Sequence, residues 1–83
     1  MDGQMITDVH GIRVRYDKST ERGIYYLKYD LSPNEAKVII EYARNHGQAE
    51  FEDDQDRDYT LVKGADGTYT LVLRQETSSG GWF

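Results

Sequence analysis

The segment "SPNEAKVIIEYARNHG", residues 32–47, predicts the one long helix of the fold. Ser32 suits the N-cap, Pro33 suits the first helical position, where its missing N–H costs nothing, and Glu35 completes a capping box. Gly47 favours a left-handed stop at the other end. An apolar stripe at helical spacing is formed by Ala36, Ile39, Ile40 and Ala43. We therefore expect an amphipathic helix that covers one face of a sheet.

Two segments before this helix alternate between apolar and polar residues. "GIRVRYD" places Ile12, Val14 and Tyr16 on one face, and "IYYLKYDL", residues 24–31, alternates in the same way. We predict that the two segments are strands joined in a hairpin by a polar turn over residues 18–23. The earlier "QMITDV" is able to pair as a short edge strand.

The pattern alone does not decide which face of residues 24–31 is buried. Burial of Tyr25, Leu27, Tyr29 and Leu31 leaves Tyr26 and Lys28 exposed. Burial of the opposite face exposes Tyr25 and Tyr29 as an aromatic pair, which is a candidate protein-binding patch because Tyr is enriched at interaction hot spots.

The chain after the helix predicts three more strands. "QAEFED" directs Ala49 and Phe51 inward, and residues 59–63 and 68–74 form a hairpin around the turn Asp66–Gly67. The order ββαβββ indicates an α+β, two-layer fold, in which a single helix covers one face of an antiparallel sheet of four to five strands. We expect one domain over residues 1–75 and a flexible tail with an aromatic end over residues 76–83.

The charge of the chain is concentrated in one place. The 83 residues include 15 acidic and 10 basic side chains, for a net charge of −5. Six of the acids and one of the bases lie within Glu50–Asp58, which leaves nine of each elsewhere. A balanced remainder argues against nucleic-acid binding through bulk positive charge. The chain has no cysteine, no signal-peptide pattern and no membrane-length apolar run, so we predict a cytoplasmic protein.

Calcium binding is one interpretation of the acidic stretch. Asp54, Asp56 and Asp58 match the first half of an EF-hand loop. The glycine of the sharp turn is replaced by Tyr59, and the bidentate glutamate is replaced by Ala65. We therefore predict no metal site.

Two other interpretations of the stretch need no metal. Closely spaced carboxylates imitate backbone phosphates and occupy basic grooves, as in small inhibitors of phage or mobile-element type. Alternatively, the acids solvate a loop and protect an edge strand from edge-to-edge pairing, which explains why Glu50 and Glu52 alternate with Ala49 and Phe51.

Catalysis has little support in the sequence. His10 and His46 have no Cys, Ser or second His at the spacing of a nucleophile or zinc site. "KGADG" lacks the lysine and hydroxyl of a phosphate-binding loop. We predict no enzyme activity and no cofactor.

The leading hypothesis is a small non-enzymatic interaction module or inhibitor that binds a protein partner. The surface that it binds on the partner is either basic or used for nucleic-acid binding. Its predicted contacts are Glu50, Glu52, Asp53, Asp54, Asp56, Asp58, Trp82 and Phe83. The alternative is binding of single-stranded nucleic acid on a basic and aromatic sheet face. That face is predicted to contain Arg13, Arg15, Tyr26, Lys28 and Arg74.

Overall fold

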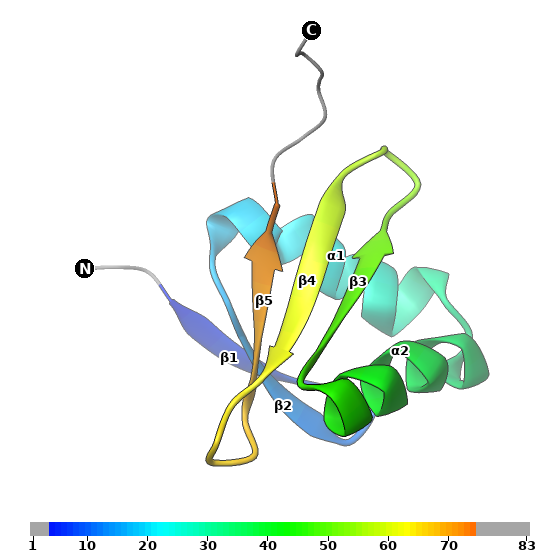
Figure 1. Cartoon of the computed structure of the whole chain (residues 1–83). Coiled ribbons are helices and arrows are strands. Elements are labelled where there is room, and N and C mark those ends of the chain that lie inside the picture. The colour runs from blue at the N-terminus through cyan, green and yellow to red at the C-terminus, as the bar shows by residue number, and fades with distance from the viewer. Residues whose placement is uncertain (1–3, 75–83) are drawn as a thin grey trace, which may run out of the picture.

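A computed structural model describes residues 4–74, which form a five-stranded sheet with helices on one face (Figure 1). The strands are β1 (Met5–Val9), β2 (Ile12–Tyr16), β3 (Gln48–Glu52), β4 (Asp58–Lys63) and β5 (Tyr69–Leu73). The helical elements are η1 (Lys18–Thr20), α1 (Glu21–Tyr25), η2 (Tyr26–Asp30) and α2 (Pro33–His46). The predicted α+β, two-layer fold is confirmed.

The sheet is mixed, in the order β1-β2-β5-β4-β3. Its neighbouring strands are antiparallel except at one seam, where β2 and β5 run parallel through the pairs Val14–Tyr69 and Arg15–Thr70. The predicted antiparallel arrangement of the whole sheet is therefore wrong at this seam. The last strand enters between two hairpins instead of joining an edge, which no local pattern encodes.

The predicted strand over residues 24–31, and its hairpin with residues 12–16, are wrong. Residues 18–30 are helical, so α2 is not the single covering helix. Asp17 begins the turn by accepting a hydrogen bond from the Ser19 N–H (2.9 Å), while its own N–H donates to the Thr20 hydroxyl (3.0 Å). The last turn is π-helical and is closed by the Leu31 N–H on the Tyr26 carbonyl oxygen (3.0 Å).

Strand β2 pairs instead with β1, and β1 is the edge strand predicted for "QMITDV". The two strands are joined by His10 and Gly11, whose φ values of 47° and 95° are those of a two-residue hairpin turn of type I′. The His10 imidazole Nε2 donates to the Leu27 carbonyl oxygen (2.9 Å). This bond ties the first hairpin to the helical layer.

Helix α2 forms as predicted from its sequence. The Ser32 hydroxyl accepts from the Glu35 N–H (3.2 Å), and the Glu35 carboxylate accepts from the Ser32 N–H (2.9 Å). Gly47 ends the helix with φ of 92°. In the predicted stripe, Ala36, Ile40 and Ala43 are buried and Ile39 is half-buried.

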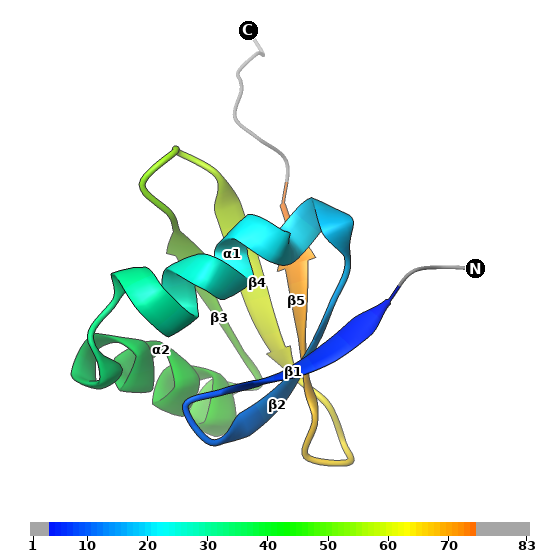
Figure 2. The same ribbon diagram turned by 180° about the vertical axis from the view of Figure 1, so that it is seen from behind.

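The core lies between the sheet and the helical elements that cross its rear face (Figure 2). Gly23 allows α1 to approach closely, because a Cβ at this position would lie 2.9 Å from side-chain atoms of both Leu71 and Tyr59. The predicted β4–β5 hairpin is confirmed, and Gly67 adopts φ of 87° in its turn. The largest of the fully buried side chains are Val9, Val14, Thr20, Leu27, Tyr59 and Leu61.

Candidate functional site

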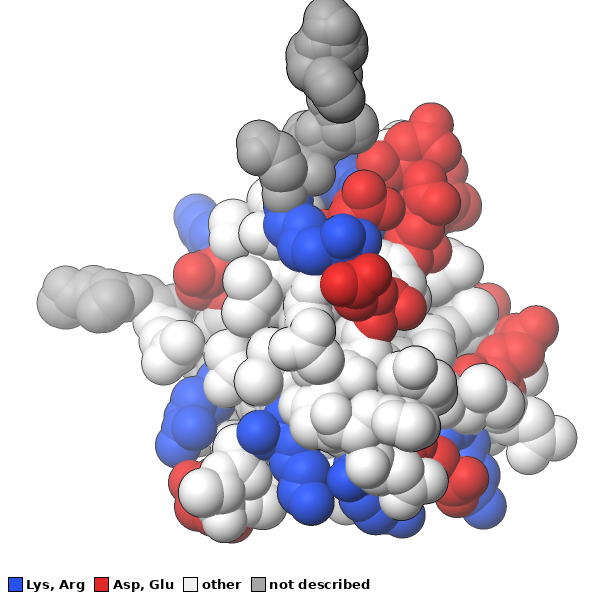
Figure 3. Space-filling view, in the orientation of Figure 1, with Lys and Arg blue, Asp and Glu red and all other residues white. Residues whose placement is uncertain are grey.

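The acidic side chains gather over the loop between β3 and β4 (Figure 3). This acidic loop, residues 53–57, extends beyond the end of the sheet (Figure 1). Two backbone hydrogen bonds close it, from the Asp53 N–H to the Arg57 carbonyl oxygen (3.0 Å) and from the Asp56 N–H to the Asp53 carbonyl oxygen (3.3 Å). Asp56 takes a left-handed conformation with φ of 63°, which Asp tolerates better than most residues.

Asp53 organises the acidic loop from inside. Its side chain is 3% exposed, and its Oδ1 accepts from the N–H groups of Gln55 (2.9 Å) and Arg57 (3.0 Å). Its Oδ2 accepts from the Tyr59 hydroxyl (3.3 Å) and lies 3.9 Å from the Arg57 guanidinium. The prediction that Asp53 contacts a partner is therefore corrected: its carboxylate is occupied within the loop.

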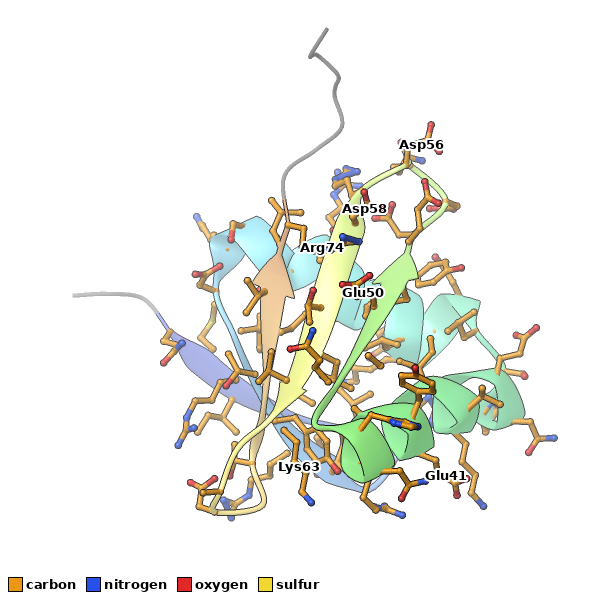
Figure 4. The ribbon with its side chains drawn as sticks, in the orientation of Figure 1. Glu41, Glu50, Asp56, Asp58, Lys63 and Arg74 are labelled. Atoms are coloured by element: carbon orange, nitrogen blue, oxygen red, sulfur yellow. The ribbon has the colours of Figure 1, made fainter. Side chains whose placement is uncertain are left out.

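Two more of the predicted contact residues are paired with one arginine. The Arg74 guanidinium lies 3.8 Å from the Glu50 carboxylate and 3.8 Å from the Asp58 carboxylate (Figure 4). These partly exposed ion pairs are weak individually but reduce the local negative charge. The remaining acids, Glu52, Asp54 and Asp56, are exposed.

A cleft separates the acidic loop from the helical layer. It has a volume of about 350 Å³, and one wall consists of tyrosines from α1 and η2. Tyr25 and Tyr29 are 53% and 68% exposed, and their ring centroids lie 5.7 Å apart. Carboxylates from both sides border the cleft, and Arg22 adds one cation. The acidic lining residues are Asp30, Asp53 and Asp54.

The pKa of Tyr26 reflects the negative charge around this cleft. Burial raises the pKa of its phenol, and the negative charges of Asp54, Asp53, Glu35 and Asp30 raise it further. The Tyr26 ring lies parallel to the Phe51 ring at a centroid distance of 6.1 Å and so connects the helical layer to β3. The cleft thus combines an aromatic wall with a negative field.

The network of Asp53 gives a pH dependence at Tyr59. Burial, the nearby Asp53 carboxylate and the hydrogen bond to it raise the pKa of Tyr59 to about 12 from an ordinary value of 10. The folded protein therefore holds this proton more tightly than the unfolded chain. We expect the free energy of unfolding to fall by about 2–3 kcal/mol as pH rises from about 10 to about 12, measured by urea titration at each pH.

Tyr59→Phe is the matched variant, because it keeps the ring and removes the titrating group. Its stability should fall less over the same interval, with a residual decrease from Tyr26, whose pKa is also raised. An equal fall in both proteins would contradict the assignment.

The five residues predicted for a nucleic-acid face do not share one surface. Arg13 and Arg15 lie on the open face of β2, where Arg15 pairs with Asp66 (3.6 Å). Tyr26 and Lys28 belong to the helical layer, and the Lys28 ammonium contacts the Thr7 hydroxyl (3.3 Å). Arg74 is engaged by acids. The predicted face depended on residues 24–31 being a strand.

Metal and membrane features are lacking in the part of the chain that the structure describes. Within residues 4–74, no three His, Asp or Glu side chains are placed to hold a metal ion. Asp54 and Asp56 lie in the acidic loop and Asp58 begins β4, and the three carboxylates do not form such a group. The helices described here are too short or too polar to cross a membrane.

Sequence reasoning found the acids but not the aromatic wall beside them. The alternating pattern predicts Tyr25 and Tyr29 as an exposed aromatic pair in only one of its two alternatives, and it places Asp30 on the opposite face of that strand. Their helical spacing of four residues was the available signal. The other two predicted contact residues, Trp82 and Phe83, lie outside the described residues.

Comparisons of the chain with protein-family models, with curated proteins and with solved structures find no match.

Proposed function

We propose that this protein is a non-catalytic interaction module that binds a basic segment of a partner protein. The contact surface consists of the acidic loop and the tyrosine wall facing it. The observation that carries the proposal is the cleft of about 350 Å³ that joins Tyr25 and Tyr29 to Asp30 and Asp54. The same proposal includes a cytoplasmic location, because a chain without cysteine needs no oxidising compartment in which to form disulfides.

An arginine or lysine side chain has the chemistry that this cleft accepts. A guanidinium group stacks on exposed aromatic faces and forms charge-assisted hydrogen bonds with carboxylates. The exposed rings of Tyr25 and Tyr29 supply the first contact, and the Asp30 and Asp54 carboxylates supply the second. Glu52 and Asp56 extend the negative field along the loop, which speeds the approach of a basic partner.

The proposal predicts how binding of a defined basic probe changes with charge. The probe is an arginine-rich peptide, and affinity is measured by calorimetry at two salt concentrations. The variant Glu52→Gln/Asp54→Asn/Asp56→Asn should bind about tenfold more weakly, because an exposed ion pair contributes roughly 0.5 kcal/mol and 1.4 kcal/mol is a factor of ten. This variant leaves Asp53 and the ion pairs of Arg74 intact.

The control, Asp8→Asn/Glu41→Gln/Asp66→Asn, changes the net charge equally at positions that do not line the cleft. It should bind almost as the parent protein does, whereas Tyr25→Ala/Tyr29→Ala should lose affinity despite unchanged charge. Equal weakening by both charge variants would reduce the binding to bulk electrostatics and defeat the proposal. Salt-sensitive retention on single-stranded nucleic acid, without peptide binding, would favour the alternative function.

A further inference from the structure

A second hollow, separate from the tyrosine cleft, lies between α2 and the edge strand β3. Its volume is about 560 Å³. The helix contributes Val38, Ile39 and Tyr42 to its wall, and Ala49 faces it from β3. Because β3 pairs with β4 on one side only, the groove also borders a strand edge that is open to an extended chain.

The apolar side chains of this groove are more exposed than packing of the helix requires. Val38 is 69% exposed and Tyr42 is 55% exposed, whereas Ala36, Ile40 and Ala43 already bury the core-facing stripe of α2. The Tyr42 ring is held against the His46 imidazole at a centroid distance of 4.1 Å. The groove therefore presents a fixed aromatic and aliphatic wall to a ligand.

We infer that this groove binds Trp82 and Phe83 of the same chain. The described chain ends at Arg74, whose guanidinium lies 3.8 Å from the Glu50 carboxylate, and Glu50 borders the groove. Residues 75–83 are nine in number and span at most about 30 Å when extended. Two residues of β3, or about 7 Å, separate Glu50 from Gln48 at the far end of the strand. The tail is therefore long enough to reach the groove.

The chemistry of the tail matches that of the groove. Trp82 is the single tryptophan of the chain, and with Phe83 it adds a large apolar surface next to residues that are otherwise polar or glycine. The spacer "SSGG" before them permits a sharp change of direction. Attachment to the same chain gives the aromatic pair a high effective concentration at the groove.

The fluorescence of Trp82 tests the inference in the full chain. We expect blue-shifted emission and a quenching constant for acrylamide several-fold lower than in the urea-unfolded protein. Val38→Asp should restore most of the quenching and shift the emission to the red. Val72→Asp is the matched control, because Val72 is also an exposed valine (43%) but lies on the open sheet face.

Three results would overturn the inference. The first is an acrylamide quenching constant of Trp82 in the native protein equal to that in urea, and the second is an equal change of emission in Val38→Asp and Val72→Asp. The third is a blue shift of the emission that vanishes on dilution, because that result would assign the groove to the tail of a second copy. If Val38→Asp fails to fold, amide spectra of the parent and Trp82→Ala proteins decide instead. Shifts confined to the groove residues of α2 and β3 support docking, and their absence contradicts it. Glu52→Gln/Asp54→Asn/Asp56→Asn should leave Trp82 emission unchanged, which separates this test from that of the tyrosine cleft.

Discussion

Ile24→Ala should lower the free energy of unfolding by about 2–4 kcal/mol, whereas Tyr25→Ala should change it by no more than about 0.5 kcal/mol. Ile24 is 2% exposed and packs in the core, whereas the next residue, Tyr25, is 53% exposed. The first change leaves a cavity, and the second removes a ring that faces solvent. Urea unfolding of both variants gives the comparison.

This pair separates the helix from a strand over residues 24–31 that buries Tyr25 and Leu27. A strand over residues 24–31 with Tyr25 and Leu27 inward reverses the ranking, because Ile24 then points outward. If Ile24→Ala is too unstable to measure, Ile24→Val should cost about 1 kcal/mol and preserve the order. A larger loss from Tyr25→Ala than from the Ile24 variants would contradict the burial of Ile24 in α1.

Asp53→Ala should cost about 2–3 kcal/mol, because it leaves two backbone N–H groups and a buried phenol without their acceptor. Those donors are the amides of Gln55 and Arg57 and the Tyr59 hydroxyl. The neighbouring Asp54→Ala removes the same charge from an exposed site and should cost no more than about 0.5 kcal/mol. Thermal unfolding of the two variants at one pH checks the difference.

The Asp53 experiment also tests the division of the acidic stretch into a structural and a binding part. Asp54→Ala should reduce the free energy of binding of the arginine-rich peptide more than it reduces the free energy of unfolding. Asp53→Ala, measured below its unfolding transition, should reduce the free energy of unfolding more than the free energy of binding. Equal stabilities of the two variants would mean that the Asp53 carboxylate is replaceable by water.

Helix α2 could be predicted from the sequence because its signals are local. The capping box of Ser32 and Glu35, the proline at position 33 and the stop at Gly47 lie within 16 residues and form the expected contacts. The β4–β5 hairpin is similar, since Asp66 and Gly67 determine its turn. These elements and the strand order along the chain were enough for the fold class.

Residues 24–31 could not be assigned from their own pattern. Ile24, Leu27 and Leu31 fit a helical face, but the same segment also alternates like a strand and is rich in Tyr, which favours strands. Packing decided between the two: Gly23 admits close contact with Tyr59 and Leu71, and Asp17 caps the turn that precedes α1. Such contacts join residues that are distant in sequence.

The candidate site was predictable in its charges and not in its arrangement. The sequence located all six acids but gave no sign that Asp53 faces inward or that Arg74 reaches Glu50 and Asp58. The tyrosine wall lies opposite the loop because residues 21–30 are helical, whereas the alternation over residues 24–31 predicts a strand. Side-chain placement across two layers is a property of the tertiary structure.

The parallel seam between β2 and β5 bears on how the protein is made. A ribosome releases β1, β2 and α2 well before β5, the strand that occupies the middle of the sheet. Until Tyr69 to Leu73 emerge, β2 and β4 each expose an unpaired backbone edge, and the two halves have no strand between them. A nascent or truncated chain that lacks β5 is therefore the form most prone to aggregate, and the sheet is completed only when β5 has left the ribosome.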